Sequence, residues 1–216
     1  MIEEFYELSP RLLELDKQAR GLCAGQFAAL EEIKEYNQLK MLRAFTDSGV
    51  GGQHLVGTTG YGTDDPGRDK LEQVFAKAVG AEASLFRQSF LSGTHTLSVA
   101  LFGVLRPGDT MLSVTGMPYD TLQGVIGLAG ESSGSLKEFG IRYEQVDLRP
   151  DGTPDYEAME TAITPRHRMV YIQRSRGYSL RPSLSVEEIG RIVEIAKRRA
   201  PGCIVMVDNC YGEYVQ

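Results

Sequence analysis

The sequence predicts an α/β fold in which a mostly parallel β-sheet is sandwiched by helices. From about residue 65 onward, short apolar runs alternate with longer segments of helical periodicity. The apolar runs are continuous, as in CIVMV at residues 203–207, and continuous runs indicate strands that are buried on both faces. Helix-start signals separate the runs, such as the capping box of Ser185 and Glu188. Alternation of this kind favours a parallel sheet with helices on both faces.

The first 46 residues are expected to form an N-terminal helical arm. Ser9 is a good N-cap, and Pro10 suits the first helical position. Gly21 and Gly25 are expected to divide the arm into two helices. One apolar stripe runs along the arm, formed by Leu12, Leu13, Leu15, Leu30, Ile33, Leu39 and Leu42. The remainder, residues 47–216, is assigned to one large domain.

The large domain begins with a stretch rich in glycine and threonine, residues 47–67, that has neither a helical nor a strand period. It is too apolar for a simple flexible linker, and loops of this length in compact proteins tend to be functional. The elements that follow are predicted in this order: a helix over residues 65–79 closed by Gly80, a strand 83–87, a helix 94–105, strands 110–114 and 142–146, a helix 155–163, a strand 169–173, a helix 185–199 and a strand 203–207.

Composition and charge exclude several classes of protein. The net charge is −6 and the basic residues are scattered, so no basic surface for nucleic acid is expected. No apolar run approaches the ~18 residues that a membrane span requires, and the acidic start does not resemble a signal peptide. We therefore expect a cytoplasmic protein. Three cysteines without CxxC spacing and only three histidines give no reason to expect disulfides or a metal site.

Ligands of parallel sheets bind at the carboxyl ends of the strands, which makes the loops there candidate sites. The first candidate is Ser92-Gly93-Thr94, at the start of the helix predicted over residues 94–105. Free backbone N–H groups and the helix dipole make such a turn suitable for a phosphate. The alternative is an ordinary Ser or Thr N-cap.

Two further candidates lie at the same edge of the sheet. Tyr119, on a loop after the strand 110–114, can stack on a flat ring, or it can be a half-buried loop tyrosine. Asp208 ends the apolar strand CIVMV, where a desolvated carboxylate needs a partner to stay ionised. A protonated pyridine nitrogen is such a partner. The alternative is a turn or helix-capping aspartate.

The order of these three motifs resembles the fold-type-I pyridoxal-phosphate (PLP) enzymes, and in particular the Cys/Met-metabolism (transsulfuration) family. The segments FRQSFLSGTHTLSVALFGVLRPGDTMLSVTGMPYDTL and IVEIAKRRAPGCIVMVDN carry this resemblance. The segments GYGTDDPGRDKLE, SGTH and VDNCYGE are more similar still to a bacterial branch known as methionine γ-lyase-like or aluminium-resistance proteins. The resemblance covers residues 51–216 and implies a PLP-dependent transferase-like large domain.

The resemblance implies a role for each motif. Ser92, Gly93 and Thr94 would bind the cofactor phosphate. Tyr119 would stack on the cofactor ring, and Asp208 would bind the pyridine nitrogen. In addition, Tyr61 resembles the tyrosine with which one subunit reaches the phosphate of its neighbour.

The sequence departs from the family pattern at two places. Thr63 stands where the family has an arginine, two residues after the tyrosine, and Arg68 is the nearest substitute. Gly177 stands where the family has an asparagine near the cofactor. Beside it, Arg174 and Arg176 either bind a substrate carboxylate or face water.

The resemblance implies a PLP-dependent carbon–sulfur lyase that acts on a sulfur-containing amino acid, as cystathionine β-lyase and methionine γ-lyase do. The alternative is a catalytically inactive relative that binds PLP or acts as a scaffold. The residues do not distinguish β-elimination from γ-elimination, transfer or racemisation. A nucleotide-binding Rossmann protein is disfavoured because neither GxGxxG nor GxxxxGK[ST] occurs.

The lysine that should hold PLP is expected beyond Gln216. Every lysine of the sequence lies in a segment predicted as helix, except Lys137, which lies in an earlier loop. The family has a small domain after the large one, so the large domain is expected to be incomplete here. The helical arm and residues 47–67 favour packing against a neighbouring subunit, and we expect a homodimer or homotetramer.

Overall fold

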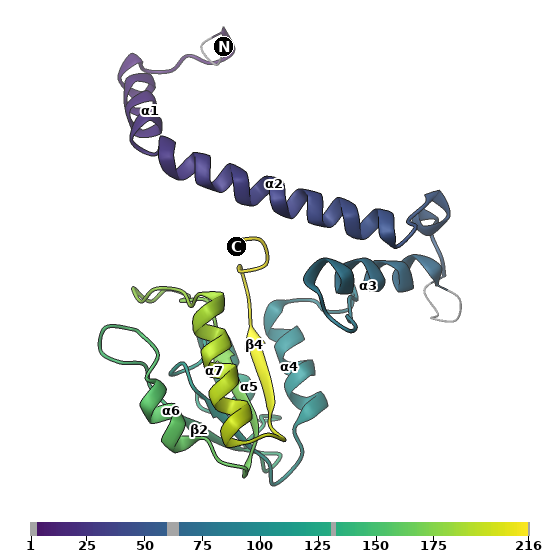
Figure 1. Ribbon diagram of the computed structural model, residues 1–216, viewed down its shortest axis with the longest axis vertical. Helices are drawn as coiled ribbons and strands as arrows, with labels where there is room; N and C mark the ends of the chain where they lie inside the picture. The colour runs from purple at the N-terminus through teal and green to yellow at the C-terminus, as the bar shows by residue number, and fades with distance from the viewer. Residues whose placement is uncertain (1–3, 60–64, 131–132, 216) are drawn as a thin grey trace. The chain divides into compact units, whose positions relative to one another are not determined.

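The computed structural model describes residues 4–59, 65–130 and 133–215, which fall into two compact units. The first unit comprises residues 1–87 together with 214–216, and the second comprises residues 88–213 (Figure 1). No helix within the described ranges is both long and apolar enough to cross a membrane. The division into an arm of residues 1–46 and a domain of residues 47–216 stays a prediction.

The first unit is helical. Helix α1 spans Pro10–Leu22 and α2 spans Ala24–Asp47, so the predicted arm is divided between Gly21 and Gly25 as expected. Ser9 occupies the N-cap position of α1, although its side chain makes no capping hydrogen bond. A short 3-10 helix, η2 (Gly52–Leu55), and helix α3 (Pro66–Val79) follow.

Helix α3 has the ends that the sequence predicts. The Asp65 side chain accepts a hydrogen bond from the backbone N–H of Arg68. Gly80 ends the helix with a φ of 68°, a left-handed conformation that glycine adopts without strain. The helix packs on the end of α2 through Ala44, Val74 and Ala78.

The second unit contains a four-stranded parallel sheet with the strand order β2-β1-β3-β4. Its strands are β1 (Thr110–Ser113), β2 (Arg142–Gln145), β3 (His167–Gln173) and β4 (Ile204–Asp208). Helices α4 (Gly93–Val104) and α5 (Asp120–Ile126) belong to one apolar layer, and α6 (Tyr156–Ala162) and α7 (Val186–Arg199) belong to the other. The predicted fold class, a parallel sheet sandwiched by helices, is confirmed (Figure 1).

Alternation along β3 shows how one strand serves both layers. Val170 and Ile172 pack with α6 and α7, whereas Met169 and Tyr171 pack with α4 and α5. All four side chains are fully buried. Burial on both faces is the reason that this strand reads as a continuous apolar run in the sequence.

One predicted strand is wrong. Residues 83–87 form no strand, and they are tied to Glu72 of α3 instead. The Glu72 carboxylate accepts the backbone N–H of Phe86 at 2.9 Å and pairs with Arg87. The Glu72 carbonyl accepts the Ser84 hydroxyl at 2.7 Å.

Helix α5 was not predicted from the sequence. Its seven residues are too few for an apolar period to be recognised. Gly127, which ends it with a φ of 92°, was the available signal. The remaining predicted helices and strands agree with the structure to within one or two residues.

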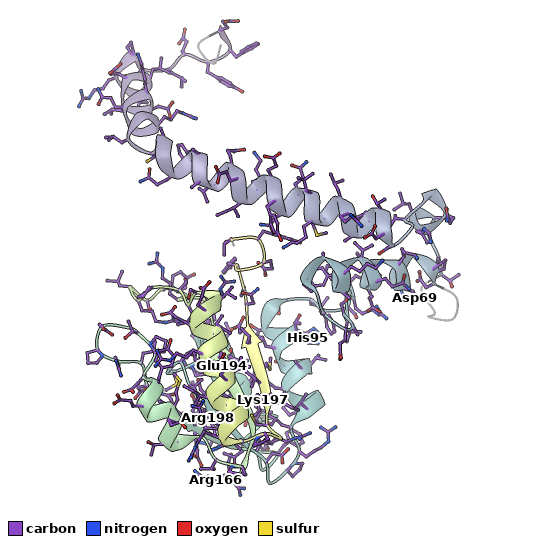
Figure 2. All side chains as sticks on the ribbon, in the orientation of Figure 1. Asp69, His95, Arg166, Glu194, Lys197 and Arg198 are labelled. Carbon is purple, nitrogen blue, oxygen red and sulfur yellow. The ribbon has the colours of Figure 1, made fainter. Side chains whose placement is uncertain are left out.

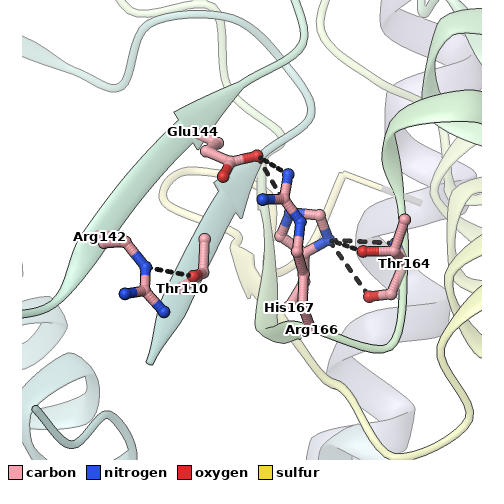
Figure 3. A network of polar contacts seen from close by, with 6 residues as sticks. All are labelled: Thr110, Arg142, Glu144, Thr164, Arg166 and His167. Atoms are coloured by element: carbon pink, nitrogen blue, oxygen red, sulfur yellow. Dashed lines mark hydrogen bonds and ion pairs between the residues drawn. The ribbon is translucent and has the colours of Figure 1, made fainter. Parts of the chain in front are cut away.

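A polar network lies toward the amino end of the sheet, away from the carboxyl edge that carries the candidate site. The buried His167 and the exposed Arg166 both contact the Glu144 carboxylate, at 3.2 Å and 2.7 Å. The backbone N–H of Thr164 donates to the His167 ring at 3.1 Å. Figure 3 shows these contacts, of which those of Glu144 reach from β2 to β3 across the intervening strand β1. They connect these two strands and involve no residue of the carboxyl edge.

Candidate functional site

The candidate site lies at the carboxyl edge of the sheet in the second unit. The ends of β1, β3 and β4 meet there, because all the strands run in parallel. The helices α4 and α5 supply residues at their N-termini. Five of the six predicted site residues belong to this unit: Ser92, Gly93, Thr94, Tyr119 and Asp208. The sixth, Tyr61, lies outside the described residues, as does Thr63.

Helix α4 begins at the predicted Ser-Gly-Thr turn. The Ser92 hydroxyl accepts the backbone N–H of His95 at 3.1 Å, so Ser92 is the N-cap. Gly93 is exposed, and no atom lies within 4 Å of the position that a Cβ would take. The Thr94 hydroxyl is hydrogen-bonded to that of Thr121 at 2.7 Å, which joins the starts of α4 and α5. Figure 2 labels His95 on α4.

The capping role of Ser92 therefore agrees with the alternative interpretation of this turn, an ordinary Ser or Thr N-cap. An anion can still bind at the N-terminus of α4. Ser92 accepts a hydrogen bond from only one backbone N–H of the first turn, and the other N–H groups of that turn remain available. The first turn of the 12-residue helix α4 points its backbone N–H groups away from the helix, with the positive end of the helix dipole behind them. Phosphate binding stays a prediction.

Tyr119 precedes α5 as its N-cap residue and is 36% exposed. Its backbone N–H donates to Oε1 of Gln173 at 2.7 Å. Its ring lies beside Tyr178, with the ring centroids 6.2 Å apart. The hydrogen bond with Tyr178 and partial desolvation raise the pKa of Tyr119.

Gly177 explains one departure from the family pattern. It has a φ of 57°, and a Cβ there would lie 3.1 Å from Cδ2 of Tyr119. An asparagine could adopt this backbone conformation, but its Cβ would press on the tyrosine ring. The glycine therefore lets the loop after β3 pack directly against Tyr119.

Asp208 ends β4 and is 8% exposed. It lies opposite Gln173 in the register of β3 and β4. The Tyr171 hydroxyl donates to Oδ2 of Asp208 at 3.2 Å, and the backbone N–H of Cys210 donates to Oδ1 at 3.1 Å. Among the described residues, no arginine, lysine or histidine forms an ion pair with Asp208. The result is a nearly buried carboxylate whose hydrogen bonds come from neutral groups.

The two arginines near the site differ in their surroundings. Arg174 is 7% exposed, and its guanidinium donates to Oδ1 of Asn209 at 2.9 Å and to the carbonyl oxygens of Gly212 and Leu184 at 2.8 Å and 3.0 Å. Its burial contradicts the interpretation in which Arg174 faces water. The interpretation in which it binds a substrate carboxylate stays a prediction. The contacts of Arg174 hold the turn after Asp208. Arg176 is exposed, as one of its two interpretations expects.

Arg68 has a partner of its own in the first unit. Its guanidinium Nε lies 3.1 Å from Oδ2 of Asp65, the residue that caps α3. That Arg68 takes the place of the arginine in the family pattern therefore stays a prediction.

Gln173 was missed by the sequence analysis. Its backbone N–H donates to the Thr115 hydroxyl at 2.9 Å, and its side-chain amide bonds both the N–H of Tyr119 and the carbonyl of Ser175. It thereby joins the loops that follow β1 and β3. The available signal was a polar residue at the end of an otherwise apolar strand.

None of the lysines in the second unit lies at the carboxyl edge. Lys197, on α7, donates to the carbonyl of Cys203 at 2.6 Å, just before β4 begins. Figure 2 labels Lys197 on this helix. Lys137 lies in the turn between α5 and the start of β2, which is also the amino end of the sheet. The other lysines lie on α1, α2 and α3 of the first unit, as predicted.

Comparison with known proteins gives consistent matches. The chain matches the family described as methionine gamma-lyase over residues 12–216. It is 48% identical to the uncharacterized protein YnbB of Bacillus subtilis over 194 residues, which cover 89% of this chain and 46% of that protein. It is 29% identical to the L-methionine gamma-lyase of Pseudomonas putida over 150 residues, 68% of this chain and 32% of that enzyme.

A solved structure extends this comparison. The carbon–sulfur lyase involved in aluminium resistance from Clostridium novyi superposes with a TM-score of 0.89 at 45% identity, over 96% of this chain and 50% of that one. The chain thus spans about half the length of YnbB and of this lyase. Because the family match extends over nearly all of its residues, the chain belongs to the methionine gamma-lyase family.

Proposed function

We propose that the full-length protein is a PLP-dependent carbon–sulfur lyase that cleaves a sulfur-containing amino acid by β- or γ-elimination. Family membership and the named activities of the relatives support this proposal. The observation that carries it is Asp208. A nearly buried carboxylate at the carboxyl end of a parallel strand, without a cationic partner among the described residues, is suited to a ligand with a protonated ring nitrogen.

The residues at this edge have the chemical groups that PLP binding requires. PLP carries a phosphate, a flat ring and a pyridine nitrogen, and each has a suitable partner here. The N-terminus of α4 offers free N–H groups at Gly93, where the backbone is open to close approach. Tyr119 offers a partly exposed ring held by Gln173, and Asp208 offers the negative charge. When bound, PLP supplies an electron sink for the negative charge that forms at the substrate.

Each residue then has a defined task. Gly93 and Thr94 bind the phosphate through their backbone N–H groups, next to Ser92 at the cap. Tyr119 orients the ring by stacking. Asp208 keeps the proton on the ring nitrogen, because its charge favours the cation. We also propose that Tyr61 reaches the cofactor phosphate of a neighbouring subunit.

The proposal places the cofactor lysine outside these 216 residues. Two observations support it. The lysines of the second unit lie at the amino end of the sheet, away from Asp208, and those of the first unit lie within the helices α1, α2 and α3 rather than on a loop after a strand. A lysine that holds PLP must reach the carboxyl edge.

The proposal also includes a homodimer or homotetramer. Helix α1 buries none of its residues, and α2 buries only Asn37 and Ala44. The apolar stripe of these helices is instead exposed, at 46–60% for its outermost members Leu12, Leu15, Leu30, Leu39 and Leu42. Exposed apolar surface of this extent marks an interaction site, and a second copy of the chain is the occupant we propose.

Asp208→Ala in the full-length enzyme is expected to lower kcat/KM for the cleaved amino acid by roughly 100-fold or more, because the charge next to the ring nitrogen is lost. Thiol release from methionine, cystathionine and cysteine is the measurement, with the thermal midpoint recorded in parallel. The matched control is Asp147→Ala, which removes an exposed carboxylate two residues beyond β2. Comparable turnover in wild type and Asp208→Ala would remove this carboxylate from the mechanism.

Borohydride reduction of the full-length protein followed by peptide mapping is expected to find the pyridoxyl group on a lysine beyond Gln216. A pyridoxyl group on any of the seven lysines within these 216 residues would contradict the assignment of the site. A protein that binds PLP but is labelled on no lysine would instead support the catalytically inactive alternative.

Replacing Leu39 and Leu42 together by glutamate is expected to weaken self-association at least about 100-fold, since two apolar contacts are exchanged for charges. Sedimentation velocity of the full-length protein measures the change. Gln38→Glu, which adds a charge at a polar exposed position of the same helix, is the control. If the double variant sediments as the wild type does, the arm is not an assembly surface. In that case a protein without residues 1–45 should keep both its assembly and its activity.

A further inference from the structure

We propose that Tyr171 is a positioning residue that holds the Asp208 carboxylate in the orientation in which it binds the ring nitrogen of the cofactor. This inference rests on the proposed function, which assigns that contact to Asp208. The observation behind it is the hydrogen bond from the Tyr171 hydroxyl to Oδ2 of Asp208, 3.2 Å long and fully buried on the tyrosine side.

The carboxylate is held from two elements. Tyr171 on β3 donates to one oxygen, and the backbone N–H of Cys210, in the turn after β4, donates to the other. Two donors on different oxygens fix the plane of a carboxylate, which could otherwise rotate about its Cβ–Cγ bond. A carboxylate has about four acceptor positions, so roughly two remain for a ligand.

The hydroxyl of Tyr171 is a permanent donor. Burial, and then the charge of Asp208, raise the pKa of Tyr171 well above its ordinary value. The phenol therefore keeps its proton near neutral pH. Because an ionised carboxylate only accepts hydrogen bonds, the direction of this hydrogen bond is fixed.

The ring of Tyr171 cannot move to another partner. It is fully buried in the apolar layer with Met111 and Leu122. Its position is set by the strand that also carries Gln173, the residue opposite Asp208. Because the core fixes the ring of Tyr171, the hydroxyl holds the carboxylate in one position. A supporting residue preorganises a site in this way.

Tyr143 provides a matched comparison. It lies on β2 against the same apolar layer, and burial raises its pKa to about 12. Its hydroxyl, however, contacts Oε1 of Gln145 at 2.7 Å rather than Asp208. Tyr143→Phe therefore removes a hydroxyl from the same layer without touching the proposed contact.

The test compares two cofactors on the full-length apoenzyme. The first is PLP, and the second is 1-deazapyridoxal phosphate, in which a CH group replaces the ring nitrogen. Equilibrium dialysis gives the dissociation constant of each for wild type, Tyr171→Phe and Tyr143→Phe. Tyr171→Phe is expected to weaken PLP binding about tenfold, because a carboxylate held by one donor instead of two has to be ordered when the ring nitrogen binds. It should change binding of the deaza compound less than about twofold, and Tyr143→Phe should change neither by more.

Each other outcome has a defined meaning. An equal loss for both cofactors, or no loss for PLP, overturns the role of Tyr171 while PLP dependence stands. Wild-type protein that binds both cofactors equally overturns the contact between Asp208 and the ring nitrogen, and this inference with it. A full-length protein that binds no PLP overturns the proposed function as well.

A second measurement covers the case in which Tyr171→Phe does not fold. 3-Fluorotyrosine is placed at position 171 of the full-length protein and observed by 19F NMR. Its signal should move when PLP is added and stay in place when the deaza compound is added. A signal that responds equally to both, or to neither, overturns the proposal.

Discussion

The charge of Asp208, at the buried carboxyl end of β4, is the constraint on which the arrangement of this sheet edge depends. A carboxylate that is out of contact with water must accept hydrogen bonds or meet a cation. Tyr171 and the backbone of Cys210 supply the hydrogen bonds. Within the described chain no cationic side chain pairs with it. The charge that remains is what the proposed cofactor would neutralise.

Two buried polar side chains give this edge its rigidity. Gln173 connects the loop that carries Tyr119 to the end of β3, and Arg174 connects the turn after β4 to the segment before α7. The contacts of Gln173 with Tyr119 and of Arg174 with Asn209 join segments that are 54 and 35 residues apart in the sequence. Loops that would otherwise be free are thereby tied to the strands, and a site built on such loops keeps its geometry before a ligand arrives.

Much of the fold follows from local signals, whereas the support of the site does not. The caps at Asp65 and Ser185 and the strand before Asp208 depend on neighbours in the sequence, and each was predicted. The expected burial of that strand on both faces was wrong, since β4 is only partly buried and Val207 is exposed. The roles of Tyr171 and Gln173 depend on the register of β3 against β4, which no local pattern encodes. Residues 83–87 were predicted wrongly for another reason: the Glu72 side chain, on the helix just before them, takes the backbone N–H of Phe86.

The ring nitrogen of the bound cofactor gives the most direct test of the central claim, that Asp208 holds a protonated pyridine. PLP labelled with 15N at this position is bound to the full-length protein and observed by 15N NMR near neutral pH. The account predicts a chemical shift and a one-bond coupling to hydrogen typical of a protonated pyridine, because the carboxylate stabilises the cation. A shift typical of neutral pyridine, in a protein that does bind PLP, would contradict it.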